Sequence, residues 1–215
     1  MNPITIIDYG LSNLLSVQRA FEHFGAAVKL ARSPDEVFAA KALVLPGVGA
    51  FRDGMQGLRK LDLVEPIRQK AAQGTPLLGI CLGMQMLFEE SEEFGRWEGL
   101  GLIPGRVVRI PDTDAEGRAQ RVPQVGWNRL LPAGGKQDFD RSLLEGIRRG
   151  EEVYFVHSYE AKPTNPADLL AVTVYGGRRI CAVARRGSVT GCQFHPEKSG
   201  RVGLNVIRAL IEAAG

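Results

Sequence analysis

Residues 76–90, PLLGICLGMQMLFEE, change from a continuous apolar run to a mixed pattern within a few positions. The run up to Cys81 is typical of a buried strand, and the residues from Leu82 onward have the spacing of an amphipathic helix. Gly79 lies two residues before the cysteine and Gly83 two residues after it. Glycines permit a strained backbone and a close approach of neighbouring chains. The stretch therefore predicts a strand, a sharp turn that carries Cys81, and a helix.

The segments before this stretch alternate in the same way. Residues 4–9, 28–31 and 42–49 are short, largely apolar and typical of strands. Helical patterns cover residues 12–25 and 62–74, and a brief helix is expected after residue 33. Side chains that favour helix ends mark these boundaries: Ser12, Gly25, Ser33 with Pro34 and Glu36, Asp62 with Glu65, and Gly74. Alternating strands and helices predict a parallel sheet with helices on both faces.

Strands predominate after about Gly99. The segments concerned are RVVRIP (106–111), EVYFVHSY (152–159), LLAVTVY (169–175) and CAVARRGSVTGCQF (181–194). They favour an antiparallel or mixed arrangement attached to the first sheet. A last helix is expected after a cap at Ser199, with a buried side formed by Val202, Ile207, Leu210 and Ile211. We expect one α/β domain over residues 1–215, with a central, mostly parallel sheet flanked by helices and an antiparallel or mixed portion in its second half.

The composition excludes several classes of protein. The chain has 215 residues, 44% of them hydrophobic, which suits one globular domain with a substantial core. Net charge is +3 and no basic stripe with interleaved aromatic residues occurs, so no nucleic-acid partner is expected. Neither a membrane span nor a signal peptide is expected. The three cysteines, Cys81, Cys181 and Cys192, lack the spacing of a disulfide framework or zinc site. We expect a cytoplasmic protein without metal or cofactor.

The motif G-x-C-x-G at residues 79–83 has the layout of the nucleophile elbow that hydrolases build as G-x-S-x-G. A helix that begins at Leu82 aims its positive dipole end at the sulfur, and such placement favours a reactive thiolate. The same N–H groups can hold the oxyanion of a tetrahedral intermediate. The alternative is a small buried cysteine under a helix, which is a common use of this residue.

A second segment, GCQFHPEKS (191–199), supplies a base and a carboxylate. A thiolate that attacks an amide needs a base, and the base needs a group that holds its tautomer. His195 and Glu197 are separated by one residue at what is predicted to be a strand end, so their side chains should share one side. The alternative is a structural histidine beside a surface charge. Of the other histidines, His23 is expected to be structural, and His157 could line a site.

These motifs resemble the class I glutamine amidotransferases, in which GICLGMQ and a later HPE carry a Cys-His-Glu triad. Further segments resemble the glutaminase subunits of imidazole glycerol phosphate synthases, within that family and in histidine biosynthesis. These segments are DYGLSNLLSV (8–17), LPGVGAF (45–51), VGWN (125–128), YFVHSY (154–159) and QFHPEKS (193–199). The resemblance extends from residue 4 to the last helix.

The resemblance implies a role for each matching residue. Cys81 would be the nucleophile that forms a glutamyl thioester, His195 the general base and then acid, and Glu197 its orienter. Leu82 N–H would give one oxyanion donor, and Val48 N–H the other after a peptide flip. The implied glutamine-binding residues are Gly47, Gly49, Gln85, His157, Ser158 and Tyr159. The alternative for residues 46–49 is a plain tight turn.

The resemblance also implies a partner, a (β/α)₈-barrel cyclase subunit that receives ammonia in a heterodimer. Free ammonia in neutral water is mostly protonated and no longer nucleophilic, which explains the need for a dry passage. Asn13, Tyr154 and Lys198 match interface positions of the family.

The chain departs from the family pattern at Gln124 and Val125, where PHMGWN is usual. The loops 112–120 and 132–140 also look longer than usual and receive no function from the sequence. Two alternatives stay open: an amidotransferase subunit that feeds another synthase, and a catalytically silent regulatory or binding homologue. The intact Cys81, His195 and Glu197 argue against the silent homologue.

Overall fold

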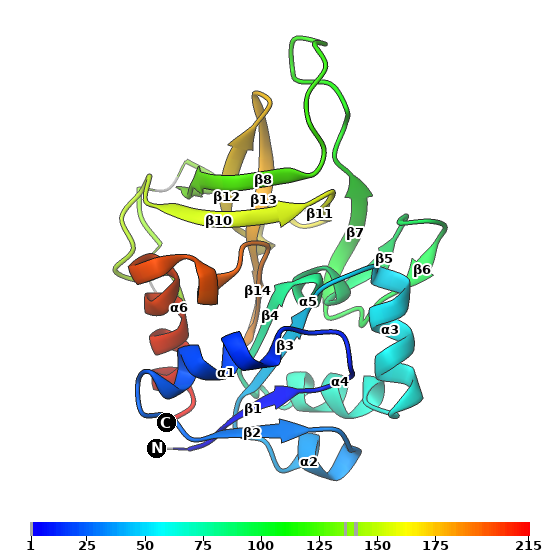
Figure 1. Cartoon of the computed structure of the whole chain (residues 1–215), viewed down its shortest axis with the longest axis vertical. Helices are drawn as coiled ribbons and strands as arrows, with labels where there is room; N and C mark the ends of the chain where they lie inside the picture. Colours follow the sequence, from blue (N-terminus) through cyan, green and yellow to red (C-terminus); the bar gives the residue numbers. More distant parts are fainter. Residues whose placement is uncertain (1, 136, 140–141) are drawn as a thin grey trace.

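The computed structural model describes residues 2–135, 137–139 and 142–215. A central sheet lies between helices, and the two ends of the chain lie close together at its lower edge (Figure 1). The side chain of Asn2 donates a hydrogen bond of 2.8 Å to the carbonyl of Ala214 and so ties one end to the other. Among the described residues, no helix combines the length and apolar character that crossing a membrane requires.

The strands are β1 (Ile4–Ile7), β2 (Val28–Ala31), β3 (Leu43–Gly47), β4 (Leu77–Cys81), β5 (Phe88–Ser91), β6 (Trp97–Glu98), β7 (Ile103–Arg109), β8 (Gln124–Arg129), β9 (Leu131–Pro132), β10 (Glu152–His157), β11 (Tyr159–Pro163), β12 (Leu169–Tyr175), β13 (Arg178–Arg186) and β14 (Val189–Cys192). The helices are α1 (Leu14–Glu22), α2 (Pro34–Phe38), α3 (Phe51–Lys60), α4 (Val64–Ala72), α5 (Leu82–Met86) and α6 (Gly200–Ala213), with short 3₁₀ helices η1 (Pro166–Asp168) and η2 (Pro196–Lys198).

The main sheet has the strand order β2-β1-β3-β4-β14-β13-β12-β9. Pairing is parallel from β2 to β14 and antiparallel from β14 to β9. The prediction of a parallel sheet that continues into an antiparallel portion is therefore confirmed. Gly47 at the end of β3 pairs with Cys81 at the end of β4, and Ile80 pairs with Cys192 at the end of β14. The carboxyl ends of three parallel strands thus meet at one edge, where ligands bind in open α/β sheets.

Two smaller sheets surround that edge. Strands β8 and β10 form an antiparallel pair that crosses above the main sheet (Figure 1). The chain leaves β10 at His157 and enters β11 at Tyr159, so Ser158 lies where the two smaller sheets join. Strand β11 belongs to a second sheet with the order β11-β7-β5-β6.

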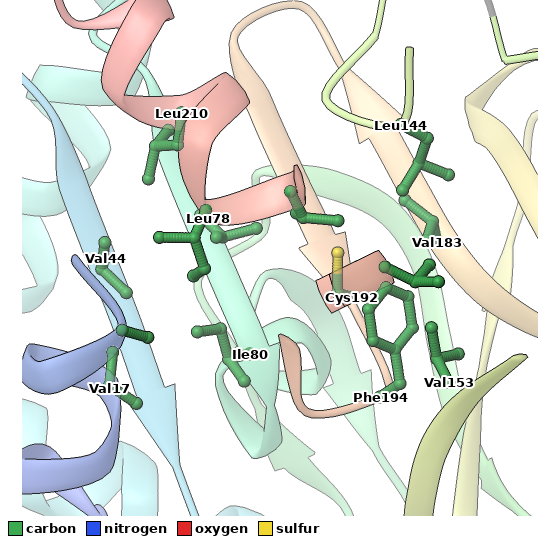
Figure 2. Packing of buried hydrophobic residues seen from close by; sticks show 14 of the residues in the cluster. Val17, Val44, Leu78, Ile80, Leu144, Val153, Val183, Cys192, Phe194 and Leu210 are labelled. Carbon is green, nitrogen blue, oxygen red and sulfur yellow. The ribbon is translucent and has the colours of Figure 1, made fainter. Parts of the chain in front are cut away.

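Alternate strand residues divide the core into two layers, because successive side chains of a strand point to opposite faces. Ile6 and Val44 pack with α1 and α6, whereas Ile7 and Leu45 pack with α2 to α5. Figure 2 shows the first layer, in which Cys192 and Phe194 lie among the strands near α6. The segment just before His195 is therefore anchored in the core, and this anchoring fixes the position of His195 relative to the strand ends.

Several details differ from the sequence-based expectations. Helix α1 begins after Asn13 rather than Ser12, whose hydroxyl is buried without a hydrogen-bond partner. Helix α4 begins after Leu63, because Asp62 takes a positive φ of 55° that does not suit a cap. The capping box of α2 is confirmed: Glu36 accepts a 3.0 Å hydrogen bond from the N–H of Ser33.

The helix after Cys81 was predicted as amphipathic, and this was wrong. Helix α5 has five residues, all of them buried, and the chain continues as β5 from Phe88. Helix α3 was not predicted, because Gly54 and Gly57 interrupt its helical pattern. Those glycines leave room for close neighbours: a Cβ at Gly54 would lie 2.6 Å from the sulfur of Met86, and one at Gly57 2.9 Å from the ring of Tyr9. Tertiary packing overrides helix propensity here.

The loops 112–120 and 132–140 are described to different extents. Residues 112–120 form a small hairpin closed by a bridge between Thr113 and Ala119, and this projection extends from the top of the molecule (Figure 1). Part of the loop 132–140 lies outside the described residues.

We predict that Gly83→Ala destabilises the fold by about 3 kcal/mol or more, because overpacking against fixed backbone has little room to relax. A Cβ at this position would overlap the carbonyl oxygen of Leu45 on β3. Denaturant unfolding followed by circular dichroism measures the loss.

Gly74→Ala is the matched control, since a Cβ there meets nothing within 4 Å although φ is +81°. It should cost only about 1 kcal/mol through backbone strain. Equal losses in the two variants would contradict a special packing role for Gly83.

Candidate active site

Cys81 lies at the junction of β4 and α5 with φ 54° and ψ −109°. A positive φ is unusual for a residue with a Cβ and stores strain that the surroundings must hold in place. Both flanking glycines are required by space: a Cβ at Gly79 would lie 2.8 Å from backbone atoms of Gly83, and one at Gly83 would overlap Leu45. The sharp turn predicted from the sequence is therefore present, and it points the sulfur toward the carboxyl edge of the sheet.

His195 and Glu197 contact each other directly. Nδ1 of His195 lies 2.8 Å from Oε1 of Glu197, and the two side chains are only 4% and 1% exposed. The sequence-based reason was wrong, because the two residues do not share a strand: β14 ends at Cys192, and Glu197 lies in η2. Ser199 fixes this turn, since its hydroxyl donates to the carbonyl of His195 at 2.6 Å and accepts from the N–H of Tyr154 at 3.0 Å.

The charge on His195 depends on these neighbours. Burial opposes the protonated ring, but the neighbouring Cys81 sulfur and the Glu197 carboxylate outweigh burial and raise the pKa of His195 to about 9. The imidazolium therefore persists at neutral pH beside the sulfur. Cys81 and His195 line the same cavity and Glu197 contacts the far side of the His195 ring, an arrangement suited to proton transfer.

A cavity of about 360 Å³ opens beside the sulfur. It brings together most of the residues that the sequence singled out: Val48, Gly49, Cys81, Leu82, Gln85, His157, Ser158, Tyr159 and His195. Gly47 does not line the cavity; it lies behind, where a Cβ would lie 3.0 Å from that of Leu82. In the described part of the chain, no group of three or more His, Cys, Asp or Glu side chains is arranged to hold a metal ion.

His157 faces the cavity as a neutral ring. Its Nδ1 lies 2.8 Å from the carbonyl of Tyr159, and because a carbonyl only accepts, Nδ1 carries the proton. Burial lowers the pKa of His157 to about 4, and the charge of His195 acts in the same direction. Of the two histidines at the site, His195 is therefore the one equipped to donate a proton at neutral pH.

The N–H of Val48 does not point into the cavity. It donates a 3.0 Å hydrogen bond to the carbonyl of Leu11, in the loop that follows β1. The hydroxyl of Tyr9 holds the same turn by donating to the carbonyl of Pro46 at 2.8 Å. In this structure the turn at residues 46–49 is therefore tied to the β1–α1 loop.

Glu93 also lines the cavity, although no sequence pattern predicted this position. Its Oε2 accepts a 2.7 Å hydrogen bond from the N–H of Phe51 at the start of α3. Burial raises the pKa of this carboxyl, and the hydrogen bond from Phe51 works against that rise. In the sequence, Glu93 is one acidic residue in the run EESEE and cannot be told from a solvated charge.

The three residues assigned to a partner interface come from neighbouring elements. Asn13 precedes α1, Tyr154 lies on β10, and Lys198 ends η2, and both α1 and β10 contact η2. Asn13 and Lys198 are exposed. Nearby on β8 and β10, three apolar side chains are unusually open to solvent: Val125 (57%), Trp127 (53%) and Val156 (37%).

Comparison with known proteins agrees with this geometry. The family model for class-I glutamine amidotransferases matches residues 5–211. The imidazole glycerol phosphate synthase subunit HisH 1 of Legionella pneumophila (strain Lens) is 50% identical over 212 residues, which are 99% of this chain and 100% of that protein. The subunit HisH of Syntrophotalea carbinolica is 48% identical over 208 residues, or 95% and 97% of the two chains.

Solved structures share the fold at much lower identity. A crystal structure of a glutamine amidotransferase has a TM-score of 0.73 at 20% identity and covers 99% of this chain and 98% of its own. PurLQS from Thermotoga maritima also has a TM-score of 0.73, at 19% identity and full coverage of both chains. The family model, the relatives and the shared fold agree, and the chain belongs to the class-I glutamine amidotransferases.

Proposed function

We propose that this chain is the glutaminase subunit of an imidazole glycerol phosphate synthase. It hydrolyses L-glutamine to glutamate and ammonia, which a cyclase subunit uses to form imidazole glycerol phosphate and AICAR in histidine biosynthesis. The observation that carries the chemistry is the strained Cys81 sulfur in one cavity with His195, whose ring contacts Glu197 at 2.8 Å. The choice of synthase rests on relatives of 50% and 48% identity that match over nearly their whole length.

The triad supports a two-step hydrolysis. His195 acts first as base and holds the proton of the Cys81 thiol, and the resulting thiolate attacks the side-chain carbonyl carbon of glutamine. The C–N bond breaks as His195 then acts as acid and gives that proton to the leaving nitrogen. Ammonia departs and a glutamyl thioester remains. His195 then takes a proton from water, whose oxygen attacks the thioester; glutamate leaves, and the sulfur regains its starting state. Glu197 holds the imidazole tautomer throughout.

The tetrahedral intermediates need two N–H donors for their oxyanion. The N–H of Leu82, at the start of α5, is one. The N–H of Val48 is the second, but only after its hydrogen bond to Leu11 breaks and the peptide rotates. The free chain therefore has an incomplete oxyanion hole.

The cavity offers several contacts for an amino-acid substrate. Gly49, Gln85 and the backbone of residues 157–159 contact the substrate, and Gly47 shapes the turn behind them. We add Glu93, whose half-buried carboxylate accepts the α-ammonium group of glutamine. Burial strengthens such a pairing relative to the same pair in water.

The whole chain acts as a single type-1 glutamine amidotransferase domain in the cytoplasm. Its partner is a (β/α)₈-barrel cyclase subunit, which covers the exposed apolar side chains of β8 and β10 and contacts Asn13, Tyr154 and Lys198. Exposed apolar groups clustered beside an active site are typical of an interaction surface. Docking there keeps water away from the released ammonia.

We predict that Cys81→Ala abolishes glutamine-dependent product formation by the reconstituted pair, because no other residue forms the thioester. Product formation from added ammonium salt should stay within about twofold of the unmodified pair, since the acceptor site is not changed. Both rates are measured with the purified subunits. Glutamine turnover by the variant would show that Cys81 is not the nucleophile.

We predict that partner binding raises glutaminase activity by about 10²-fold or more, which is the usual effect of one oxyanion donor. The reason is that the N–H of Val48 becomes available only when its bond to Leu11 is released. Glutamate release is measured for the chain alone and with the partner and its ligand. Equal activity in both states would rule out this gate.

We predict that Glu197→Gln lowers the glutaminase rate by about 10²–10⁴-fold, as expected when a general acid–base loses its orienting group. In this variant the pKa of His195 should also be lower than the value of about 9 in the unmodified chain, because the Glu197 carboxylate contributes to that raised pKa.

The raised pKa of His195 also makes the stability of the native fold depend on pH. Protonated His195 stabilises the native fold fully below pH 6.5, and this contribution disappears as the pH rises through about 9. The difference in unfolding free energy between the native chain and Glu197→Gln should therefore shrink over that range. Histidine NMR and denaturant unfolding at several pH values measure the two effects. A His195 signal that titrates at the same pH in both proteins would contradict the pairing.

A further inference from the structure

A series of side-chain amides runs beneath the active-site cavity. Nε2 of Gln85 donates to the carbonyl of Tyr159 at 3.1 Å and to Oε1 of Gln193 at 3.0 Å. Nε2 of Gln193 then donates to the sulfur of Cys81 at 3.8 Å. Gln193 is fully buried, directly after β14. A buried amide is costly unless its hydrogen bonds are made, so its place among the reacting groups needs an explanation beyond packing.

The direction of this series is set at its far end. The carbonyl of Tyr159 can only accept hydrogen bonds, and it already accepts from Nδ1 of His157 at 2.8 Å. Gln85 must therefore present its NH₂ group there, and the same group donates to Gln193. Gln193 must in turn present its oxygen to Gln85. The NH₂ group of Gln193 is left facing Cys81. The carbonyl of Tyr159, acting through Gln85 and then Gln193, therefore ensures that a hydrogen-bond donor faces the sulfur.

The sulfur has opposite partners for its two protonation states. As a thiol it can donate to the carbonyl of Val156, which lies 3.9 Å away. As a thiolate it can only accept, and Gln193 offers a donor. Hydrogen bonds to an ionised group are stronger than those between neutral groups. The carbonyl of Val156 therefore favours the thiol form of Cys81, and the amide of Gln193 favours the thiolate, which is the nucleophile.

We propose that Gln193 is a positioning residue that stabilises the Cys81 thiolate and orients its sulfur, and that Gln85 couples this donor to the segment 157–159. This inference rests on the proposed function and deepens it. Gln85 and Tyr159 line the substrate cavity. A substrate bound in this cavity therefore contacts residues of the same hydrogen-bonded series that contacts the Cys81 sulfur.

Other titratable groups also face the sulfur. His195 with Glu197, the neutral His157, and Glu93 surround the cavity, and Tyr9 lies behind it on the β1 side. A Gln193 substitution leaves all of them in place. A change in the pH dependence of Cys81 reactivity therefore isolates the contribution of the amide.

The test measures the rate at which iodoacetamide alkylates Cys81 in the full chain as a function of pH. Peptide mass spectrometry separates Cys81 from Cys181 and Cys192, which are both buried. Gln193→Met removes the donor at similar volume, and we expect the pH midpoint of alkylation to rise by about one unit, the usual weight of a hydrogen bond to a charged group. Gln193→Glu keeps the oxygen that Gln85 needs but places a carboxylate near the sulfur, so its midpoint should rise further.

Thr190→Val is the control, because it removes a buried hydroxyl from β14 without touching the sulfur. Its midpoint should match that of the unmodified chain even if its stability falls. In the reconstituted pair, Gln193→Met should lower kcat for glutamine by about tenfold and leave KM within about threefold.

An unchanged midpoint in folded Gln193→Met and Gln193→Glu would overturn the inference. If Gln193→Met does not fold, the isosteric Gln193→Glu decides the matter alone. Failure of the proposed function looks different: alkylation of Cys81 in the unmodified chain would then leave glutamine turnover intact.

Discussion

The packing of Gly83 against the carbonyl oxygen of Leu45 is the constraint on which the site depends. It allows α5 to start immediately after β4 and close against β3, so the chain must turn within one residue. Cys81 makes that turn at φ 54°, a strained conformation that holds its sulfur above the strand ends. The neighbouring strand β14 then brings His195 to the same edge, since the segment before it is anchored in the core.

The same strands that build the central sheet therefore also position the reactive side chains. Glu197 and Ser199 fix His195 from η2, while Gln193 reaches the sulfur from beneath. The turn at residues 46–49 remains tied to Leu11 and Tyr9 in the free chain. In the proposed mechanism the nucleophile is therefore in place, whereas the N–H of Val48 is not yet available as the second oxyanion donor. This difference between the two parts of the site suits the proposed function, in which ammonia is useful only when a partner is docked.

Much of this arrangement could be predicted from local patterns. The glycines around Cys81 predicted the turn, and the alternation of strands and helices predicted the parallel half of the sheet. His195 and Glu197 were paired correctly for the wrong reason, since their contact comes from a 3₁₀ turn and not from strand alternation. Helix α3 was missed because Gly54 and Gly57 are poor helix formers that serve tight packing. Glu93 and Gln193 were missed because their roles depend on contacts across the fold, and neighbouring residues give no sign of them.

Labelling the reconstituted pair with a glutamine analogue that carries an electrophilic carbon in place of the amide tests directly whether Cys81 is the nucleophile. Peptide mass spectrometry then locates the adduct. The role of Cys81 as the nucleophile predicts one label on Cys81 in each copy of this chain, loss of glutaminase activity in proportion to labelling, and protection by glutamine. A label on Cys181, Cys192 or any other residue, or full activity in the fully labelled protein, would contradict it.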